Sequence, residues 1–131
     1  MIVLDASVLI GYLDQGDGHH ERAVSLLTEV AEEVLVTSPI TLAEVLVGPA
    51  RAGRAEMIMN RLGQLPVGTV ELGHDSPLRL AGLRVATGLK MPDCCVLLAA
   101  EHVAGMIATF DQRLGEQAEA LGLRTYPLSV P

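Results

Sequence analysis

Four acidic residues in this sequence lie within or directly beside apolar stretches. They are Asp5, Glu44, Asp93 and Asp111. A charge held near a hydrophobic core is costly unless it is paired or coordinates a metal ion. Basic partners are few, because the chain has nine lysines and arginines against sixteen acids. The simplest common explanation is one shared site that binds a hard cation.

The ligand types favour Mg²⁺ or Mn²⁺ in such a site. Clustered carboxylates raise one another's pKa, and a divalent cation removes that penalty. Oxygen ligands suit Mg²⁺ or Mn²⁺, whereas zinc would require a Cys/His set that the sequence lacks. We interpret the histidines as surface or capping residues; they are His19, His20, His74 and His102.

Each acid also has a purely structural interpretation. Asp5 and Asp111 could be helix N-caps, because aspartate accepts hydrogen bonds from backbone N–H groups at that position. Asp93 could stabilise a helix N-terminus through the helix dipole. Glu44 could be a paired side chain that reaches solvent. The metal site therefore depends on the four acids meeting in space.

Composition predicts one soluble domain over residues 1–131. Half of the residues are apolar, while only three are aromatic, so few platforms exist for stacking bases. The net charge of −7 excludes a nucleic-acid coat protein but not a metal-dependent nuclease. The longest apolar run, residues 94–100, is far shorter than the ~20 residues of a membrane span. With Cys94 and Cys95 interpreted as buried apolar residues, we expect a cytoplasmic protein.

Short β-type runs alternate with helical patterns along the chain. Strands are predicted at residues 2–4, 34–37, 67–70, 106–108 and 123–125. Helices are predicted at residues 6–13, 19–33, 39–47, 50–65, 77–89, 92–104 and 111–121. This alternation is typical of an α/β fold with a mainly parallel sheet and helices on both faces.

The predicted fold places two of the acids at the edge where ligands bind. In open parallel sheets, ligands bind outside the carboxyl ends of the strands, and both Asp5 and Asp111 follow a predicted strand. Asp93 lies at the start of a predicted helix, and Glu44 lies about one and a half turns into another. We therefore expect these two to approach the same edge.

The motifs together resemble a known family. Asp5-Ala6-Ser7 follows the first strand, Glu44 lies in an early helix, Met91-Pro92-Asp93 precedes an alanine-rich helix, and Thr109-Phe110-Asp111 follows a later strand. This pattern, from Met1 to about Tyr126, resembles a PIN domain, and more narrowly the VapC-type toxins of toxin–antitoxin pairs. The resemblance implies a three-layer sandwich, Mg²⁺- or Mn²⁺-dependent endoribonuclease activity, a homodimer and a cognate antitoxin.

The resemblance also suggests roles for individual residues. Asp5 and Asp93 match the principal metal-binding aspartates of the family. Glu44 and Asp111 match the further acids that complete the site. Ser7 and Thr109 match polar positions beside the metal, where a hydroxyl could orient a carboxylate or a water molecule. The implied reaction is hydrolysis of an RNA phosphodiester by a metal-activated water, with one ion or two.

Contacts to the RNA are predicted from basic residues. Arg51, Arg54 and Arg61 fall within a sector of about 80° if they share one helix, which would give a phosphate-contacting stripe. Lys90 and Arg113 lie near the acids in sequence and are the second choice. The alternative for the arginine stripe is an ordinary solvated helix face.

Two other functions remain open from the sequence. The first is a non-catalytic PIN-fold module that acts only through protein contacts. The second is an aspartate-dependent phosphatase or receiver on a similar sheet. A phosphatase of that type would need a second aspartate where Ser7 stands, and this position argues against it.

Overall fold

The computed structural model describes residues 1–126, and a parallel sheet of four strands lies at its centre. The strands are β1 (Ile2–Leu4), β2 (Leu35–Thr37), β3 (Gly68–Thr69) and β4 (Met106–Ala108). Their order across the sheet is β3-β2-β1-β4, and every neighbouring pair is parallel. The carboxyl ends of all four strands therefore meet at one edge.

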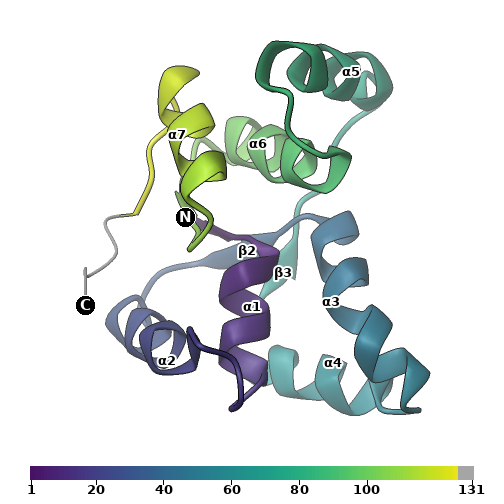
Figure 1. Ribbon diagram of the computed structural model, residues 1–131, viewed down its shortest axis with the longest axis vertical. Coiled ribbons are helices and arrows are strands. Elements are labelled where there is room, and N and C mark those ends of the chain that lie inside the picture. The colour runs from purple at the N-terminus through teal and green to yellow at the C-terminus, as the bar shows by residue number, and fades with distance from the viewer. Residues whose placement is uncertain (127–131) are drawn as a thin grey trace.

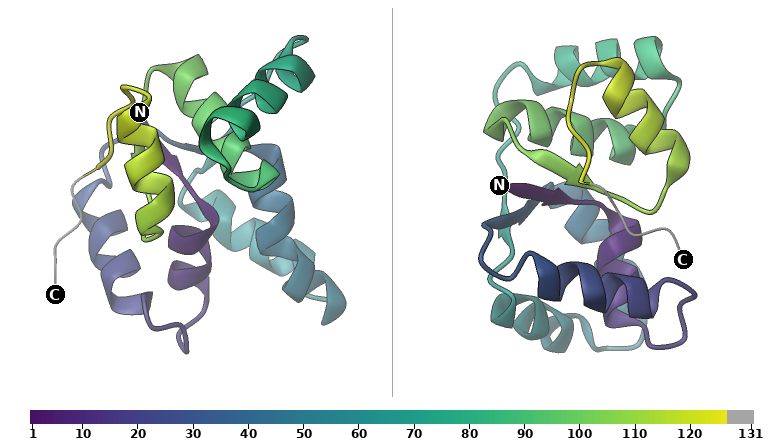
Figure 2. Two further views of the ribbon diagram at one scale, coloured as in Figure 1. Left: turned by 45° about the horizontal axis from the view of Figure 1, so that its top comes forward. Right: turned by 90° about the vertical axis from the view of Figure 1, so that its left-hand side faces the viewer.

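Helices cover both faces of this sheet, which confirms the α/β sandwich predicted from the sequence. They are α1 (Ala6–Leu13), α2 (His20–Glu29), α3 (Pro39–Arg51), α4 (Ala55–Gln64), α5 (Ser76–Thr87), α6 (Met91–Val103) and α7 (Gln112–Ala120). Helices α5–α7 lie on one side and α1–α4 on the other (Figures 1 and 2). Within residues 1–126, no helix combines the length and apolar character needed to span a bilayer.

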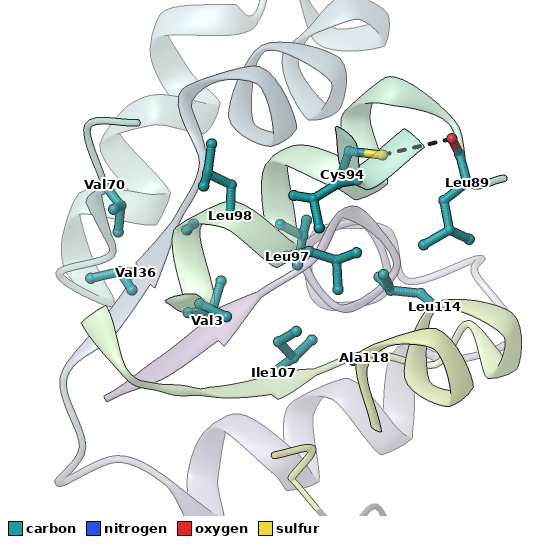
Figure 3. Close-up of a cluster of buried hydrophobic side chains, with 14 residues drawn as sticks. Val3, Val36, Val70, Leu89, Cys94, Leu97, Leu98, Ile107, Leu114 and Ala118 are labelled. Atoms are coloured by element: carbon teal, nitrogen blue, oxygen red, sulfur yellow. Dashed lines mark hydrogen bonds between the residues drawn. The ribbon is translucent and has the colours of Figure 1, made fainter. Parts of the chain in front are cut away.

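Strand β1 contributes to a hydrophobic core on each face of the sheet. Its side chains alternate, because successive residues of a strand point to opposite faces. Val3 packs with Leu97 and Ile107 under α6 and α7 (Figure 3). Ile2 and Leu4 pack in the other core, against α1, α2, α3 and α4. Burial on both faces explains why the strand is apolar without interruption.

Cys94 and Cys95 lie in the α6 segment that packs on the sheet, and both are buried free thiols. The Cys94 thiol lies 3.7 Å from the Leu89 carbonyl oxygen (Figure 3). Burial raises the pKa of both thiols above the usual value, which opposes formation of the reactive thiolate. The prediction that both cysteines are buried is confirmed.

The α3–α4 region differs from the sequence prediction. We expected a helix that ends before Gly48 and a second helix over residues 50–65. Instead, α3 continues through Pro49 to Arg51, and α4 begins at Ala55. Pro49 lies in the last turns of α3, where its own carbonyl accepts bonds from the amides of Ala52 and Arg54. The helix stops where Gly53 adopts φ +70°, a left-handed conformation that favours glycine.

Other boundaries are also shorter than predicted. The helix predicted to reach residue 33 ends at Glu29. The strand predicted at residues 123–125 is a single parallel bridge between Ile107 and Thr125. Within residues 1–126, two backbone hydrogen bonds flank this bridge. The Ile107 amide donates to the Arg124 carbonyl and the Tyr126 amide donates to the Ile107 carbonyl, both below 3 Å.

The buried face of α5 was also mispredicted. The sequence pattern favoured Leu78, Ala81, Val85 and Leu89 as the packed face of the helix predicted at residues 77–89. In the structure, Leu89 is buried as predicted. Within α5 itself, however, Leu83 and Thr87 are buried, whereas Leu78 and Val85 are 78% and 88% exposed. The pattern identifies a coherent apolar face, but it does not say what covers that face.

Candidate active site

Asp5 is the one buried acid of the four predicted site residues, with 4% of its surface exposed. It ends β1 and caps α1, because one carboxylate oxygen accepts hydrogen bonds from the Val8 amide (3.1 Å) and the Ser7 hydroxyl (2.7 Å). The other oxygen accepts a hydrogen bond from the Thr109 hydroxyl. Burial raises the pKa of the Asp5 carboxyl, and these three hydrogen bonds oppose the rise.

Ser7 and Thr109 connect Asp5 to the loop that follows β4. The Phe110 amide donates to the Ser7 hydroxyl oxygen at 3.0 Å, and the Asp111 amide donates to the Thr109 hydroxyl oxygen at 2.9 Å. Each hydroxyl thus accepts from the β4–α7 loop and donates to Asp5. This arrangement fixes the ends of two neighbouring strands relative to one carboxylate.

Asp111 is exposed and caps α7. Its Oδ1 atom accepts a hydrogen bond from the Leu114 amide at 3.1 Å. The capping role proposed for Asp5 and Asp111 from the sequence is therefore present in both. Capping occupies one oxygen of Asp111 with a single bond, and a carboxylate can accept further bonds or a cation.

Asp93 lies in the first turn of α6 and is half-buried. Burial raises the pKa of its carboxyl, and the nearby charge of Asp111 raises it further. The cationic groups of Lys90 and Arg113 act in the opposite direction. Charged groups of both signs therefore act on the pKa of Asp93.

Glu44 is exposed although it interrupts an apolar run of the sequence, which agrees with the alternative of a side chain that reaches solvent. The core-facing side chains of α3 are Thr41 and Val45, so position 44 lies outside that face. Even so, partial burial raises the pKa of the Glu44 carboxyl, and the charge of Asp93 raises it further. The charge of Lys90 lowers it. Glu44 is thus close enough to Asp93 to interact with it electrostatically.

Asp93 is the centre of the arrangement. The charge of Asp93 raises the pKa of Asp5 and of Glu44, and the charge of Asp111 raises the pKa of Asp93. However, no three His, Cys, Asp or Glu side chains within residues 1–126 stand close enough to enclose a metal ion. Folding brings the four acids to one edge of the sheet but not into a closed cage around one ion.

The donor set fits Mg²⁺ or Mn²⁺ in its chemistry. All four candidates offer carboxylate oxygens, and like charge raises the pKa of three of them. Mg²⁺ keeps several water ligands and binds through one or two carboxylates rather than a full protein cage. An open group of acids around Asp93 is compatible with that coordination.

The predicted arginine stripe does not form. Arg51 ends α3, Arg54 occupies the N-cap of α4, and Arg61 lies within α4, so the three do not share one helix. Arg54 and Arg61 line a groove of about 460 Å³ between α1, α3 and α4, which Glu44 also lines. The Arg61 guanidinium lies 5.9 Å from the centre of the Tyr12 ring.

Lys90 and Arg113, the second pair predicted to contact RNA, act electrostatically on the candidate acids. Both lower the pKa of Asp93, and Lys90 also lowers that of Glu44. Arg113 donates to the Gly88 carbonyl at 3.3 Å, which holds its guanidinium beside the start of α6. These two are the basic residues whose charges act on the pKa values of Glu44 and Asp93.

Sequence reasoning missed one group of residues beside the site. The His19 ring stacks on the Phe110 ring with centroids 4.6 Å apart, and the Arg22 guanidinium lies 4.8 Å from the Phe110 centroid. The spacing of His19 and Arg22 places them on one face of a helical segment. No pattern in the sequence indicates that this face meets Phe110.

Comparison with known proteins agrees with this fold. The model of the PIN domain family matches residues 2–120, and the chain belongs to that family. No curated protein sequence matches it.

Solved structures with the same fold include a toxin–antitoxin complex and a toxin. FitAcB from Neisseria gonorrhoeae is 22% identical, with a TM-score of 0.70 over 97% of both chains. A toxin–antitoxin complex from Klebsiella pneumoniae is 24% identical, with a TM-score of 0.66 over 85% of this chain and 87% of that one. Mycobacterium tuberculosis VapC20, described as a Sarcin-Ricin loop cleaving toxin, is 18% identical, with a TM-score of 0.71 over 94% and 96%.

Proposed function

We propose that this protein is a divalent-metal-dependent endoribonuclease and the toxin of a toxin–antitoxin pair in the cytoplasm. The observation that carries the proposal is the convergence of three acids on Asp93 at the carboxyl edge of a PIN-type sheet. The toxins and toxin–antitoxin complexes among the similar structures support the same role.

In this proposal, Asp5, Glu44, Asp93 and Asp111 hold Mg²⁺ or Mn²⁺. When bound, the cation supplies Lewis acidity to a water molecule and to the phosphoryl oxygens of RNA. Ser7 and Thr109 fix the orientation of the Asp5 carboxylate through the hydrogen bonds described above. A fixed carboxylate does not have to reorganise when it binds its ligand.

Lys90 and Arg113 are proposed to contact the RNA backbone at this site. Their positive charges lie beside acids that would otherwise repel phosphate. Arginine in particular presents planar donors that match phosphate oxygens. Arg51, Arg54 and Arg61 receive no such role, because they are divided between two helices and two of them line the α1–α3–α4 groove.

We further propose that this groove receives the cognate antitoxin. Its walls are largely apolar, and it extends to Glu44 at the acidic edge. The side chains that line it include Ile10, Leu13, Val45, Ile58, Arg54 and Arg61. A protein segment lying in the groove would reach the candidate active site and could block access to it.

We also propose a homodimer formed through the exposed face of α5. Leu78 and Val85 on that face are the most exposed large apolar side chains within residues 1–126. Ala81 and Gly82 lie between them, and no atom lies within 4 Å of a Cβ built on Gly82. Small residues between two apolar anchors allow another helix to approach closely.

A cleavage assay tests the nuclease proposal. Purified protein is incubated with several labelled structured RNAs and Mg²⁺, with and without EDTA, beside the Asp93→Asn variant. We expect cleavage by the wild type that EDTA abolishes, and no cleavage by Asp93→Asn. Equal cleavage by the variant would show that the acids are not the active site.

The second candidate is a non-catalytic module that acts only through protein contacts. One observation favours it. Within residues 1–126, no group of three His, Cys, Asp or Glu side chains lies close enough together to hold a metal ion. No EDTA-sensitive cleavage of any RNA, together with no rise in melting temperature on addition of Mg²⁺ or Mn²⁺, would support the module.

A further inference from the structure

A second cavity lies directly beside the candidate active site. It has a volume of about 240 Å³ and is formed by α2, the end of β4, the start of α7 and the chain near Tyr126. We call it the Phe110 cavity; the lining residues used below are Arg22, Thr109, Phe110, Asp111 and Gln112. Because Thr109 and Asp111 belong to both places, the cavity begins where the acidic site ends.

The hydroxyl network of the active site also positions the wall of this cavity. The Phe110 amide donates to the Ser7 hydroxyl oxygen, which itself bonds to Asp5. The Phe110 ring is held in turn by stacking with His19, with an interplanar angle of 13°. The ring therefore has a defined orientation relative to Asp5.

The Phe110 ring contacts a positively charged side chain, Arg22, at the cavity. The Arg22 guanidinium lies over the Phe110 ring, 4.8 Å from its centroid, which is cation–π geometry. The face of a guanidinium makes such a contact, and its N–H donors lie in the plane of the group. Arg22 thus brings a basic side chain into a cavity that also contains Asp111.

The chemistry of this cavity fits a phosphate group of a polynucleotide. Planar guanidinium donors match phosphate oxygens, and such charge-assisted hydrogen bonds are stronger than neutral ones. A volume of about 240 Å³ leaves room for a phosphate and part of its sugar. Gln112, at the first position of α7, adds an amide that can donate or accept.

We propose that the Phe110 cavity binds the phosphate–ribose unit next to the RNA bond that is cut, and that Arg22 is the positioning residue for its phosphate. The inference rests on the proposed ribonuclease function and adds a binding site to it. A strand whose scissile phosphate lies at Asp93 would pass Asp111 and enter the cavity, because Asp111 lines the cavity and interacts with Asp93.

RNA binding without cleavage tests this proposal. The Asp93→Asn variant serves as the background, and fluorescence anisotropy of a 5′-labelled single-stranded RNA oligonucleotide with Mg²⁺ gives the dissociation constant at several salt concentrations. We expect Arg22→Ala to weaken binding about tenfold and to reduce the slope of log affinity against log salt by about 0.7, the value for one phosphate contact with a single strand.

Two further variants separate charge from structure. Arg22→Lys keeps the charge and should retain the salt slope, with an affinity loss of only a few-fold. Phe110→Leu removes the ring that orients Arg22 and should lower affinity while the slope persists. Arg79→Ala is the matched control, because Arg79 pairs with Glu101 on the α5–α6 side of the sheet; its affinity and slope should equal those of the background.

The outcomes distinguish this inference from the ribonuclease proposal. An unchanged affinity and slope in Arg22→Ala would overturn the inference, even if the wild type cleaves RNA. A lower melting temperature of Arg22→Ala without a change in slope would show that Arg22 only holds Phe110 in place. A reduced slope in Arg22→Ala, with no EDTA-sensitive cleavage by the wild type, would support the phosphate site and reject the ribonuclease.

Discussion

The surroundings of the Asp5 carboxylate act on its charged form in opposite directions, because burial disfavours the charge and hydrogen bonds stabilise it. Three donors satisfy it, yet its pKa is still raised because burial disfavours the charged form. Asp93 is raised as well, by burial and by Asp111. Perturbed acids that adjoin one another are typical of functional sites, where charge is tolerated at a cost in stability.

This cost predicts that removing one charge stabilises the protein without metal. Asp93→Asn retains the shape of the side chain and removes its repulsion with the other three acids. In EDTA, we expect a gain in unfolding free energy of a few tenths to about 1 kcal/mol, the scale of partly screened charge pairs. Urea unfolding measures it. A less stable variant in EDTA would contradict the electrostatic description of the site.

The same argument fixes the sign of the pH dependence. The Asp93 pKa is raised in the folded protein above its usual 3.8, so the folded state binds the proton more tightly than the unfolded state. Below 3.8 both states are protonated and the carboxyl has no effect; above it, the penalty grows until the folded carboxyl ionises. The advantage of Asp93→Asn in EDTA should therefore be full at pH 7 and should shrink as the pH falls toward 3.8.

At the residue scale, the sequence correctly predicted that Asp5 and Asp111 lie at the carboxyl edge of the sheet. It did so because aspartates after apolar strands must lie at the carboxyl ends of those strands. It could not predict exposure: Glu44 and Asp111 are exposed, and only Asp5 is buried. The bonds from Ser7 and Thr109 to Asp5 also depend on how two distant loops meet.

At the scale of elements, the end of α3 determines where the α1–α3–α4 groove is formed. Because α3 continues through Pro49, its last turns extend along the groove, and Gly48 and Pro49 line it. The break at Gly53 then turns the chain into α4, which supplies Ile58 and Arg61 to the opposite wall. Pro49 lies two residues before the end of α3, and it lacks the N–H that would otherwise bond to the Val45 carbonyl four residues earlier.

Two glycines of this region test its helix boundaries in opposite directions. Gly63 lies inside α4 without a positive φ, and a Cβ there would meet no atom within 4 Å outside its chain neighbours and its own helix backbone. Gly63→Ala should therefore stabilise the protein by about 0.5–1 kcal/mol. Gly53→Ala is the matched control, because Gly53 has φ +70° and equally open space, so it should destabilise. Thermal unfolding compares them, and a stabilising Gly53→Ala would contradict the left-handed helix end.

Element boundaries were the weakest sequence predictions for a physical reason. Gly48 and Pro49 are both common at helix ends, and the local pattern does not show that a second glycine five residues later supplies the stop. The start of the same helix at residue 39 was predicted correctly. It depends on a local cap, because the Ser38 hydroxyl oxygen accepts hydrogen bonds from the amides of Ile40 and Thr41.

At the scale of the molecule, the sheet separates two cores that are fully covered, whereas the outer face of α5 is not. Of the apolar residues predicted to form the packed face of α5, Leu78 and Val85 are exposed to solvent. Sequence periodicity reports that a face is apolar, and it cannot distinguish a core from an interface. Exposed apolar faces of this kind are typical of protein contacts.

A single charge on this face tests the proposed dimer. Size-exclusion chromatography with light scattering should give the wild type about twice the monomer mass of 13.8 kDa. Val85→Glu should give the monomer mass, because a buried and unpaired carboxylate at the contact would be costly. Val34→Glu is the matched control: Val34 is 57% exposed and lies outside α5, so this variant should remain dimeric. A monomeric wild type, or a dimeric Val85→Glu, would exclude α5 as the contact and leave its exposed stripe to another partner.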